Sequence, residues 1–173
     1  FAWLKDPGKT ERLCRLARRV MVGNDTLAAW ATPRSAAVDV VPPTSATAAE
    51  LGRVHTRAFL DAVKQCSVPD SEGDVAHGIG TPDVPTFTDM HAVSSLVAGA
   101  TLGAANSVWR GDVAHAFSPA GGLHHAMPDG AAGFCVYNDV AVAIAAMLDA
   151  GAERVAYVDI DVHHGDGVEK IFW

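Results

Sequence analysis

The sequence lacks several features that mark particular classes of protein. Its 173 residues include three cysteines, Cys14, Cys66 and Cys135, an odd number without Cys-x-x-Cys spacing. This usage argues against both a disulfide framework and a thiolate zinc site. The longest unbroken apolar run, residues 140–148, is far too short to span a bilayer, and the first residues do not have the pattern of a secretory signal. These absences favour a cytoplasmic protein.

Basic residues are also scarce. Thirteen Lys and Arg stand against 20 Asp and Glu, which gives a formal net charge of −7. This charge repels polyanions, so we expect neither nucleic acid nor a membrane surface as a direct partner, and a basic substrate fits better. Apolar residues, in contrast, make up 49% of the chain and charged residues only 19%. The composition excludes a disordered chain and predicts a single globular domain.

Capping and turn residues divide the chain into predicted helices and strands. Helices are expected where apolar residues recur at helical spacing: residues 11–22 after Thr10, a stretch from Leu51 to Val54 opened by the capping box of Thr47 and Glu50, residues 57–65, residues 88–109, and a helix that Asp139 caps and Gly151 ends. Strands are expected over residues 112–117 and 154–162. The order of strand, loop, helix and strand in the second half predicts an α/β fold with parallel strands. In such sheets, ligand sites lie beyond the carboxyl ends of the strands.

The densest group of polar residues ends the second predicted strand, where the sequence reads Asp-Ile-Asp-Val-His-His-Gly-Asp-Gly. The strand period of two places Asp159, Asp161 and His163 on one face. Burying three polar groups there is costly unless they have a partner, and a metal ion would be such a partner. An Asp161 oxygen and a His163 nitrogen suit zinc, and a mixed donor set with an open position is typical of catalytic zinc. The alternative is a solvated strand end followed by a glycine turn.

A second motif places two adjacent histidines, His124 and His125, in a glycine-rich loop. Alone, such a pair is more typical of a surface turn. Beside a metal site the pair gains a function, because a metal-bound water needs a base and an imidazole is the usual one. Asp159 and Asp166 could orient these imidazoles, as a carboxylate does in a catalytic triad.

The remaining polar candidates are expected to have structural roles. The isolated histidines are predicted to lie on the surface or to be satisfied in the core, His164 to make a structural hydrogen bond, and the two tyrosines and Cys135 to pack. These residues are His55, His77, His91, His115, His164, Tyr137, Tyr157 and Cys135.

Three motifs in this order resemble a known family. They read Gly-Gly-Leu-His-His-Ala at residues 121–126, Gly-Phe-Cys-Val-Tyr-Asn-Asp at 133–139, and the Asp-rich motif at 159–167 followed by Val-Glu. The combination resembles the zinc-dependent histone deacetylase superfamily, and within it the bacterial acetoin-utilization deacetylases. The resemblance implies an arginase/deacetylase-like α/β fold of three αβα layers with a mainly parallel sheet. Residues 1–173 would form the N-terminal portion of a single deacetylase domain, truncated after the first metal-ligand strand.

The resemblance also implies a metal site and a substrate tunnel. Asp161 and His163 would be two of three ligands to zinc, or to ferrous iron in the cell. The third ligand, an Asp, and a transition-state Tyr belong to later motifs that are not among these 173 residues. Gly133 and Phe134 would line the tunnel that holds the acyl-lysine stem, and Asp83 at its rim would hydrogen-bond substrate backbone.

The implied catalytic residues are the tandem histidines and their carboxylates. His125, paired with Asp166, would be the general base and then the general acid. His124, paired with Asp159, would stabilise charge in the transition state. Monovalent cations, one of them a structural potassium ion, would bind largely through main-chain oxygens, at Asp159, Asp161 and His163 and near Phe172.

The implied reaction is hydrolysis of an acetyl-lysine side chain on a protein, by metal-activated water, to acetate and a free amine. Acetylated polyamines are the alternative substrate. An arginase-type ureohydrolase is a second alternative, but that class extends the Asp-x-His motif to Asp-x-His-x-Asp, and here the corresponding residue is Gly165. A third alternative is a binding module or catalytically incomplete fragment, which follows from the missing ligand and the missing Tyr.

Overall fold

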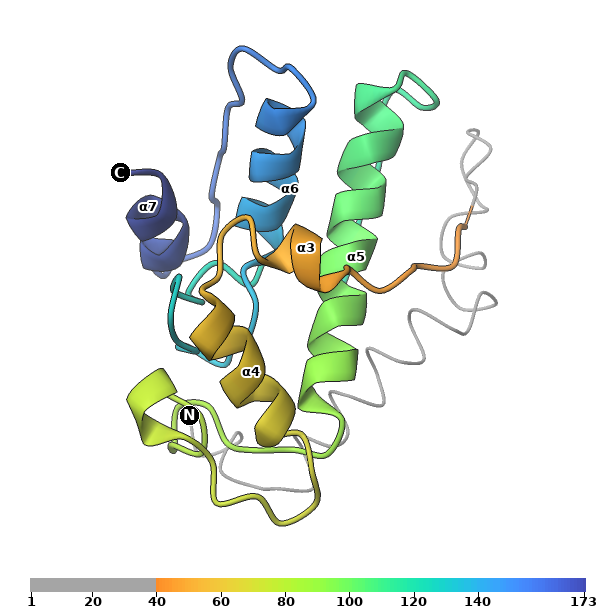
Figure 1. Cartoon of the computed structure of the whole chain (residues 1–173). Helices are drawn as coiled ribbons and strands as arrows, with labels where there is room; N and C mark the ends of the chain where they lie inside the picture. The colour runs from red at the N-terminus through yellow and green to blue at the C-terminus, as the bar shows by residue number, and fades with distance from the viewer. Residues whose placement is uncertain (1–39) are drawn as a thin grey trace.

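The computed structural model describes residues 40–173, so Cys14 and the helix expected over residues 11–22 lie outside the described residues. Within residues 40–173 the regular elements are all helical (Figure 1). They are α3 Ala48–Leu51, α4 Arg57–Gln65, the 3-10 helix η2 Val75–His77, α5 Met90–Trp109, α6 Asp139–Asp149 and α7 Asp166–Phe172. In this part of the chain, no helix combines the length and the apolar character that a membrane span requires.

Helices α3, α4, α5 and α6 lie close to where local signals predict helices, whereas η2 and α7 are not among the predicted elements. The capping box before α3 is confirmed, because the Glu50 N–H donates to Thr47 Oγ1 at 3.2 Å and the Thr47 N–H donates to Glu50 Oε2 at 2.7 Å. Helix α4 has the predicted bounds. Helix α5 begins at Met90, two residues later than predicted, because the φ of 63° at Asp89 is not helical.

The cap of α6 differs from the prediction. Asn138, and not Asp139, is the N-cap, and its side chain accepts a hydrogen bond from the Ala141 N–H at 3.0 Å. Asp139 is the first helical residue and is completely buried. Its side chain is therefore available for contacts outside the helix.

The core lies where α4, α5 and α6 meet, and α5 and α6 pack along each other (Figure 1). Large side chains with no more than 3% exposure fill it: Leu51, Phe59, Leu60, Val63, Ile79, Met90, Tyr137 and Val142. The loop that carries the tandem histidines leaves the far end of α5 and returns to the start of α6. Two packed helices therefore support this loop.

The predicted strands are not formed in residues 40–173. This part contains three isolated antiparallel bridges, Asp74 to Ile79, Met127 to Gly130 and Ala132 to Cys135, and no strand. In the segment 154–162, Val158, Ile160 and Val162 are 80%, 95% and 92% exposed.

The physical reason is that a strand is stabilised by hydrogen bonds from a neighbouring strand, and a parallel neighbour is distant in sequence. No segment of residues 40–173 supplies those hydrogen bonds to 112–117 or 154–162. The parallel sheet and the three αβα layers are therefore not present in the described part of the chain.

Candidate active site

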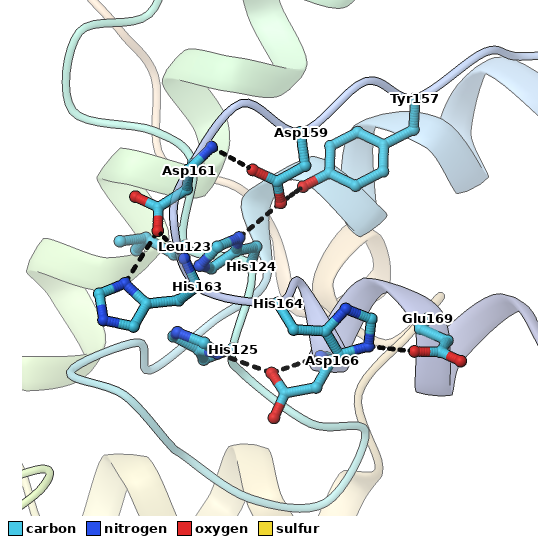
Figure 2. A network of polar contacts seen from close by, with 12 residues as sticks. Leu123, His124, His125, Tyr157, Asp159, Asp161, His163, His164, Asp166 and Glu169 are labelled. Atoms are coloured by element: carbon cyan, nitrogen blue, oxygen red, sulfur yellow. Dashed lines mark hydrogen bonds and ion pairs between the residues drawn. The ribbon is translucent and has the colours of Figure 1, made fainter.

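Three segments bring the predicted site residues together. They are the loop that carries His124 and His125, the segment 157–163, and the first turn of α7 (Figure 2). The rings of His124 and His125 lie 4.2 Å apart between centroids, and the ring of His125 lies 5.9 Å from that of His163. Directly hydrogen-bonded residues up to 41 positions apart in sequence therefore meet in this cluster.

The first histidine is paired with a carboxylate. His124 Nδ1 lies 2.6 Å from Asp159 Oδ2, and the Tyr157 hydroxyl donates to the same oxygen (Figure 2). The hydrogen bonds from His124 and Tyr157 hold the pKa of Asp159 well below its usual range. Burial and the adjacent carboxylate raise the pKa of Tyr157. The prediction that Tyr157 only packs is wrong, because its hydroxyl donates to Asp159, two residues along the same extended segment.

The second histidine forms a similar but more exposed pair. His125 Nδ1 lies 2.6 Å from Oδ1 of Asp166, the first residue of α7. Burial acts to raise the pKa of Asp166, but the hydrogen bond from His125 and its charge outweigh this effect, and the pKa lies below its usual value. The His125 side chain is 19% exposed, whereas that of His124 is 8% exposed. Of the two imidazoles, His125 is the one that solvent and a ligand can reach more easily.

The two predicted metal ligands are adjacent and open to solvent. His163 Nδ1 lies 2.9 Å from Asp161 Oδ1, and the His163 N–H donates to the same oxygen at 2.7 Å. These bonds from His163 lower the pKa of Asp161. The two side chains are 52% and 59% exposed, for Asp161 and His163 respectively.

This donor set fits a zinc ion only in part. A carboxylate oxygen and an imidazole nitrogen at this separation can bind one ion, but catalytic zinc takes three protein ligands. Within residues 40–173, no group of three or more His, Cys, Asp or Glu side chains is arranged to hold a metal. The described residues therefore supply two donors, and the third has to come from elsewhere.

The predicted tunnel residues lie against His125. Gly133 has a φ of 55°, and a Cβ built on it would lie 2.3 Å from Cδ2 of the His125 ring, so only glycine allows this approach. Phe134 also has a positive φ, of 64°, and is 45% exposed. Asp83 Oδ2 accepts a hydrogen bond from the Gly133 N–H at 2.7 Å. In this structure Asp83 binds the main chain of Gly133, and both the tunnel and the contact of Asp83 with substrate stay predictions.

The predicted cation residues do not form a defined cation site in the described part. Asp159 and Phe172 border one cavity of about 630 Å³, whose other walls are mainly apolar, with Ile144, Leu148 and Val168 among them. The monovalent sites at Asp159, Asp161, His163 and Phe172 stay predictions.

Four of the other histidines have structural partners. His55 is buried; its Nδ1 donates to Met127 O at 3.0 Å and its Nε2 accepts from the Asn138 N–H at 3.0 Å. Burial lowers the pKa of His55 to about 4, so this imidazole is neutral near pH 7. Three more contacts are similar in kind: His77 with Asp74, His91 with the Tyr137 hydroxyl, and His164 with Glu169.

Gly165 bears on the ureohydrolase alternative. A Cβ at this position would lie 2.6 Å from Asp159 Oδ2 and 3.3 Å from His124 Nδ1. The pair of His124 and Asp159 therefore occupies the space that a second carboxylate of an Asp-x-His-x-Asp motif would need. The geometry argues against a two-metal site.

Two residues that support the site do not emerge from sequence reasoning. The sequence predicts Asp139 to be a helix cap and assigns no role to Thr101. Asp139 binds the loop before His124, and Thr101 binds Asp139. The one signal in the sequence is that two good capping residues, Asn138 and Asp139, stand in a row although a helix needs one.

Comparisons with known proteins agree with the motifs. The family model for the histone deacetylase domain matches residues 7–173. The acetoin utilization protein AcuC of Bacillus subtilis (strain 168) is 45% identical over 138 residues, which are 78% of this chain and 35% of that protein. The histone deacetylase clr6 of Schizosaccharomyces pombe is 37% identical over 140 residues, 79% of this chain and 34% of that protein.

Solved structures give the same result. The crystal structure of an HDAC homolog from Aquifex aeolicus matches with a TM-score of 0.68 and 34% identity, over 76% of this chain and 36% of that one. An HDAC homolog complexed with SAHA matches with a TM-score of 0.67. The chain spans about a third of the length of these relatives. The resemblance inferred from the three motifs is confirmed, and the chain belongs to the histone deacetylase family.

Proposed function

We propose that the protein is a metal-dependent amidohydrolase that removes the acetyl group from lysine side chains of proteins and releases acetate and a free amine. The observation that carries this proposal is the pair of His125 and Asp166, 2.6 Å apart and partly open, beside the two donors Asp161 and His163. The names of the relatives support the reaction class. The proposal concerns the whole protein, of which the 173 residues match about a third of the relatives' length.

Asp161 and His163 would hold the metal, zinc or ferrous iron, together with a ligand from outside the described residues. When bound, such an ion lowers the pKa of a water and polarises an amide carbonyl. The 2.9 Å hydrogen bond between Asp161 Oδ1 and His163 Nδ1 supports this assignment, because it places an oxygen donor and a nitrogen donor side by side. Their exposure leaves room for a third ligand and a substrate.

His125 would move the proton. Its Nδ1–H donates to Asp166, which fixes the ring and the tautomer and leaves Nε2 to take a proton from the attacking water. His125 would then return that proton to the leaving amine. The carboxylate of Asp166 keeps its charge near neutral pH, because its pKa lies below the usual value, and it can therefore stabilise the imidazolium that forms.

His124 would stabilise negative charge that develops on the substrate oxygen. It is buried more deeply than His125, and Asp159 fixes its ring. Two donors, His124 and Tyr157, share one oxygen of that carboxylate, so the ring has little freedom to turn. This rigidity suits an electrostatic role better than proton transfer to solvent.

Gly133 and Phe134 would form one wall of the channel for the acyl-lysine stem. The positive φ of Gly133 brings its main chain against the His125 ring, and the Phe134 side chain that follows it is exposed. An exposed aromatic ring one residue from this contact suits the aliphatic stem of lysine.

The test uses the full-length protein and an acetyl-lysine peptide, with acetate release and bound zinc as the two measurements. The variant His125→Ala should lose about 10²-fold to 10⁴-fold in kcat and keep its metal. Substantial residual activity would contradict the role of His125. Turnover of acetylated polyamines without turnover of the peptide would overturn the substrate class, and no acetate from either would overturn the proposed reaction.

A further inference from the structure

We propose that Asp139 and Thr101 are positioning residues for the tandem histidines. The buried carboxylate of Asp139, held by the hydroxyl of Thr101, fixes the main chain directly before His124. The proposal rests on the proposed function, because it names what holds the proton-transferring histidine of that same site. Neither residue is among those that the motifs single out as catalytic or metal-binding.

Both carboxylate oxygens of Asp139 accept hydrogen bonds. Its Oδ1 accepts hydrogen bonds from the Leu123 N–H at 2.7 Å and the Gly122 N–H at 3.1 Å. Its Oδ2 accepts from the Thr101 hydroxyl at 2.5 Å and from the Gly122 N–H at 3.0 Å. Both oxygens are therefore saturated by two consecutive loop residues and one helix residue.

Burying this carboxylate costs free energy, because it loses its contact with water. A specific structural role for it is therefore expected. Asp139 is completely buried, burial raises its pKa, and within residues 40–173 it makes no salt bridge. Helix α6 does not need it as a cap, because Asn138 already caps that helix. What the buried carboxylate does is bind the loop, and a buried polar group is tolerated where its hydrogen bonds are complete.

Thr101 connects this contact to a second helix. It lies in the middle of α5, and its Oγ1 is also 3.1 Å from Ser118 Oγ at the start of the loop. The loop passes so close that a Cβ at Gly121 would lie 2.4 Å from both Thr101 Oγ1 and Asp139 Oδ2. Helices α5 and α6 thus hold the loop together, and both are packed elements of the core.

The neighbouring Asn138 holds the loop from the other side. Its Nδ2 donates to Ala126 O at 3.0 Å and to His124 O at 3.3 Å. The first residues of α6 therefore bind the main chain before, between and after the two histidines. Because Leu123 is bonded directly to His124, a shift at the Asp139 contact passes to both imidazoles.

The test compares two substitutions of Thr101 in the full-length protein. Thr101→Val has nearly the same shape but lacks the hydroxyl, whereas Thr101→Ser keeps it. We expect Thr101→Val to lower kcat about tenfold with KM and bound zinc unchanged, and Thr101→Ser to stay within about twofold of the wild type, because small displacements of a catalytic group cost large factors in rate. Asp139→Asn, which removes the charge and keeps the size, should lower kcat by about a hundredfold.

A matched control separates positioning from stability. Val142→Ala truncates a buried core side chain of α6 that makes no hydrogen bond to the loop, and it should reduce thermal stability without lowering kcat. If Thr101→Val and Asp139→Asn keep wild-type kcat, the inference is overturned. Each variant is assayed at the same number of degrees below its own melting temperature. If Thr101→Val and Asp139→Asn then lose no more kcat than Val142→Ala does, their role is only structural and the inference is also overturned.

A spectroscopic measurement tests the positioning role independently of the proposed substrate. The Nδ1 proton of His125, bonded to Asp166, should give a downfield ¹H NMR signal in the wild type and in Thr101→Ser, and that signal should shift or broaden in Thr101→Val. An unchanged signal refutes the positioning role. No acetate from the wild-type protein, together with a changed signal, refutes the proposed function and leaves the positioning role standing.

Discussion

Replacing Gly133 by alanine tests the geometry around His125 most directly. The added Cβ would lie 2.3 Å from Cδ2, 2.6 Å from Cγ and 2.8 Å from Cβ of His125. Ordinary contact between such atoms begins at 3.4 Å, so the imidazole has to move by 3.4 − 2.3 = 1.1 Å, or the loop has to move by as much. The 2.6 Å hydrogen bond from His125 to Asp166 does not survive a displacement of that size in most directions.

The expected loss can be given a magnitude. A misplacement of about 1 Å in a catalytic group costs roughly a hundredfold in rate, which corresponds to about 2.7 kcal/mol in the activation barrier. Gly133 also has a φ of 55°, so alanine there adds strain of roughly 1–2 kcal/mol to the folded state. The substitution should therefore lower both kcat and stability.

Gly111→Ala is the matched control, because it reproduces the strain without the collision. Gly111 has a φ of 76°, a Cβ added to it would meet nothing within 4 Å, and it follows α5 away from the site. The assay is acetate release by the full-length protein, with thermal unfolding measured in parallel. Gly133→Ala should lose about a hundredfold in kcat, and Gly111→Ala should lose only stability. Equal kcat values for the two variants would show either that Gly133 does not contact the His125 ring or that this contact does not matter for catalysis.

Three further predictions follow from the same contacts. His55 has a pKa of about 4 when folded and about 6.5 when unfolded, so the unfolded chain takes up the proton first as the pH falls. Acidification from pH 6.5 to pH 4 should therefore lower the free energy of unfolding by about 3 kcal/mol. Urea titrations of His55→Asn should show a weaker pH dependence than the wild type, and an unchanged pH dependence would contradict the buried neutral imidazole. Asp161→Ala should bind far less zinc than the wild type by elemental analysis, and full retention of zinc would exclude Asp161 as a ligand. Asp166→Asn should keep its zinc and lose about a hundredfold in kcat, and a wild-type rate would show that His125 needs no carboxylate.

The helices can be predicted from sequence because their signals are local. The capping box of Thr47 and Glu50 and the spacing within α4 involve residues no more than four positions apart. The cap of α6 shows where this reasoning fails. Asn138 and Asp139 are both good capping residues, and the choice depends on partners of Asp139 that lie 16 and 17 positions earlier in the loop.

The strands cannot be predicted reliably from a local pattern. A run of apolar residues favours an extended backbone, but a strand forms only where a neighbouring strand supplies hydrogen bonds. The segment 154–162 has the composition of a buried strand, but its apolar side chains at Val158, Ile160 and Val162 are almost fully exposed. The pattern in the sequence is local, whereas the hydrogen bonds that realise it come from elsewhere in the fold.

The spacing in the sequence predicts the candidate metal donors, whereas the pairing of each histidine with its carboxylate follows from family resemblance. The contacts of His124 with Asp159 and of His125 with Asp166 join residues 35 and 41 positions apart, and no periodicity specifies such pairs. The contact of Tyr157 is different, because the strand period of two already places Tyr157 on the same face as Asp159. Its hydroxyl donates to Asp159, and the prediction that Tyr157 packs does not use this spacing.

The two halves of the site depend on the surrounding fold to different degrees. The pair of His125 and Asp166 is held by packed elements, because the Val168 N–H donates to His124 O at 3.2 Å and Gly167 lies so close that a Cβ there would be 2.4 Å from Ala126 O. Asp161 and His163, in contrast, are about half exposed, and their segment is bonded mainly to itself. The proton-transfer half is therefore fixed by α6 and α7, whereas the metal-binding half has few contacts outside its own segment. Mild destabilisation should therefore disturb the pair of Asp161 and His163 before it separates His125 from Asp166.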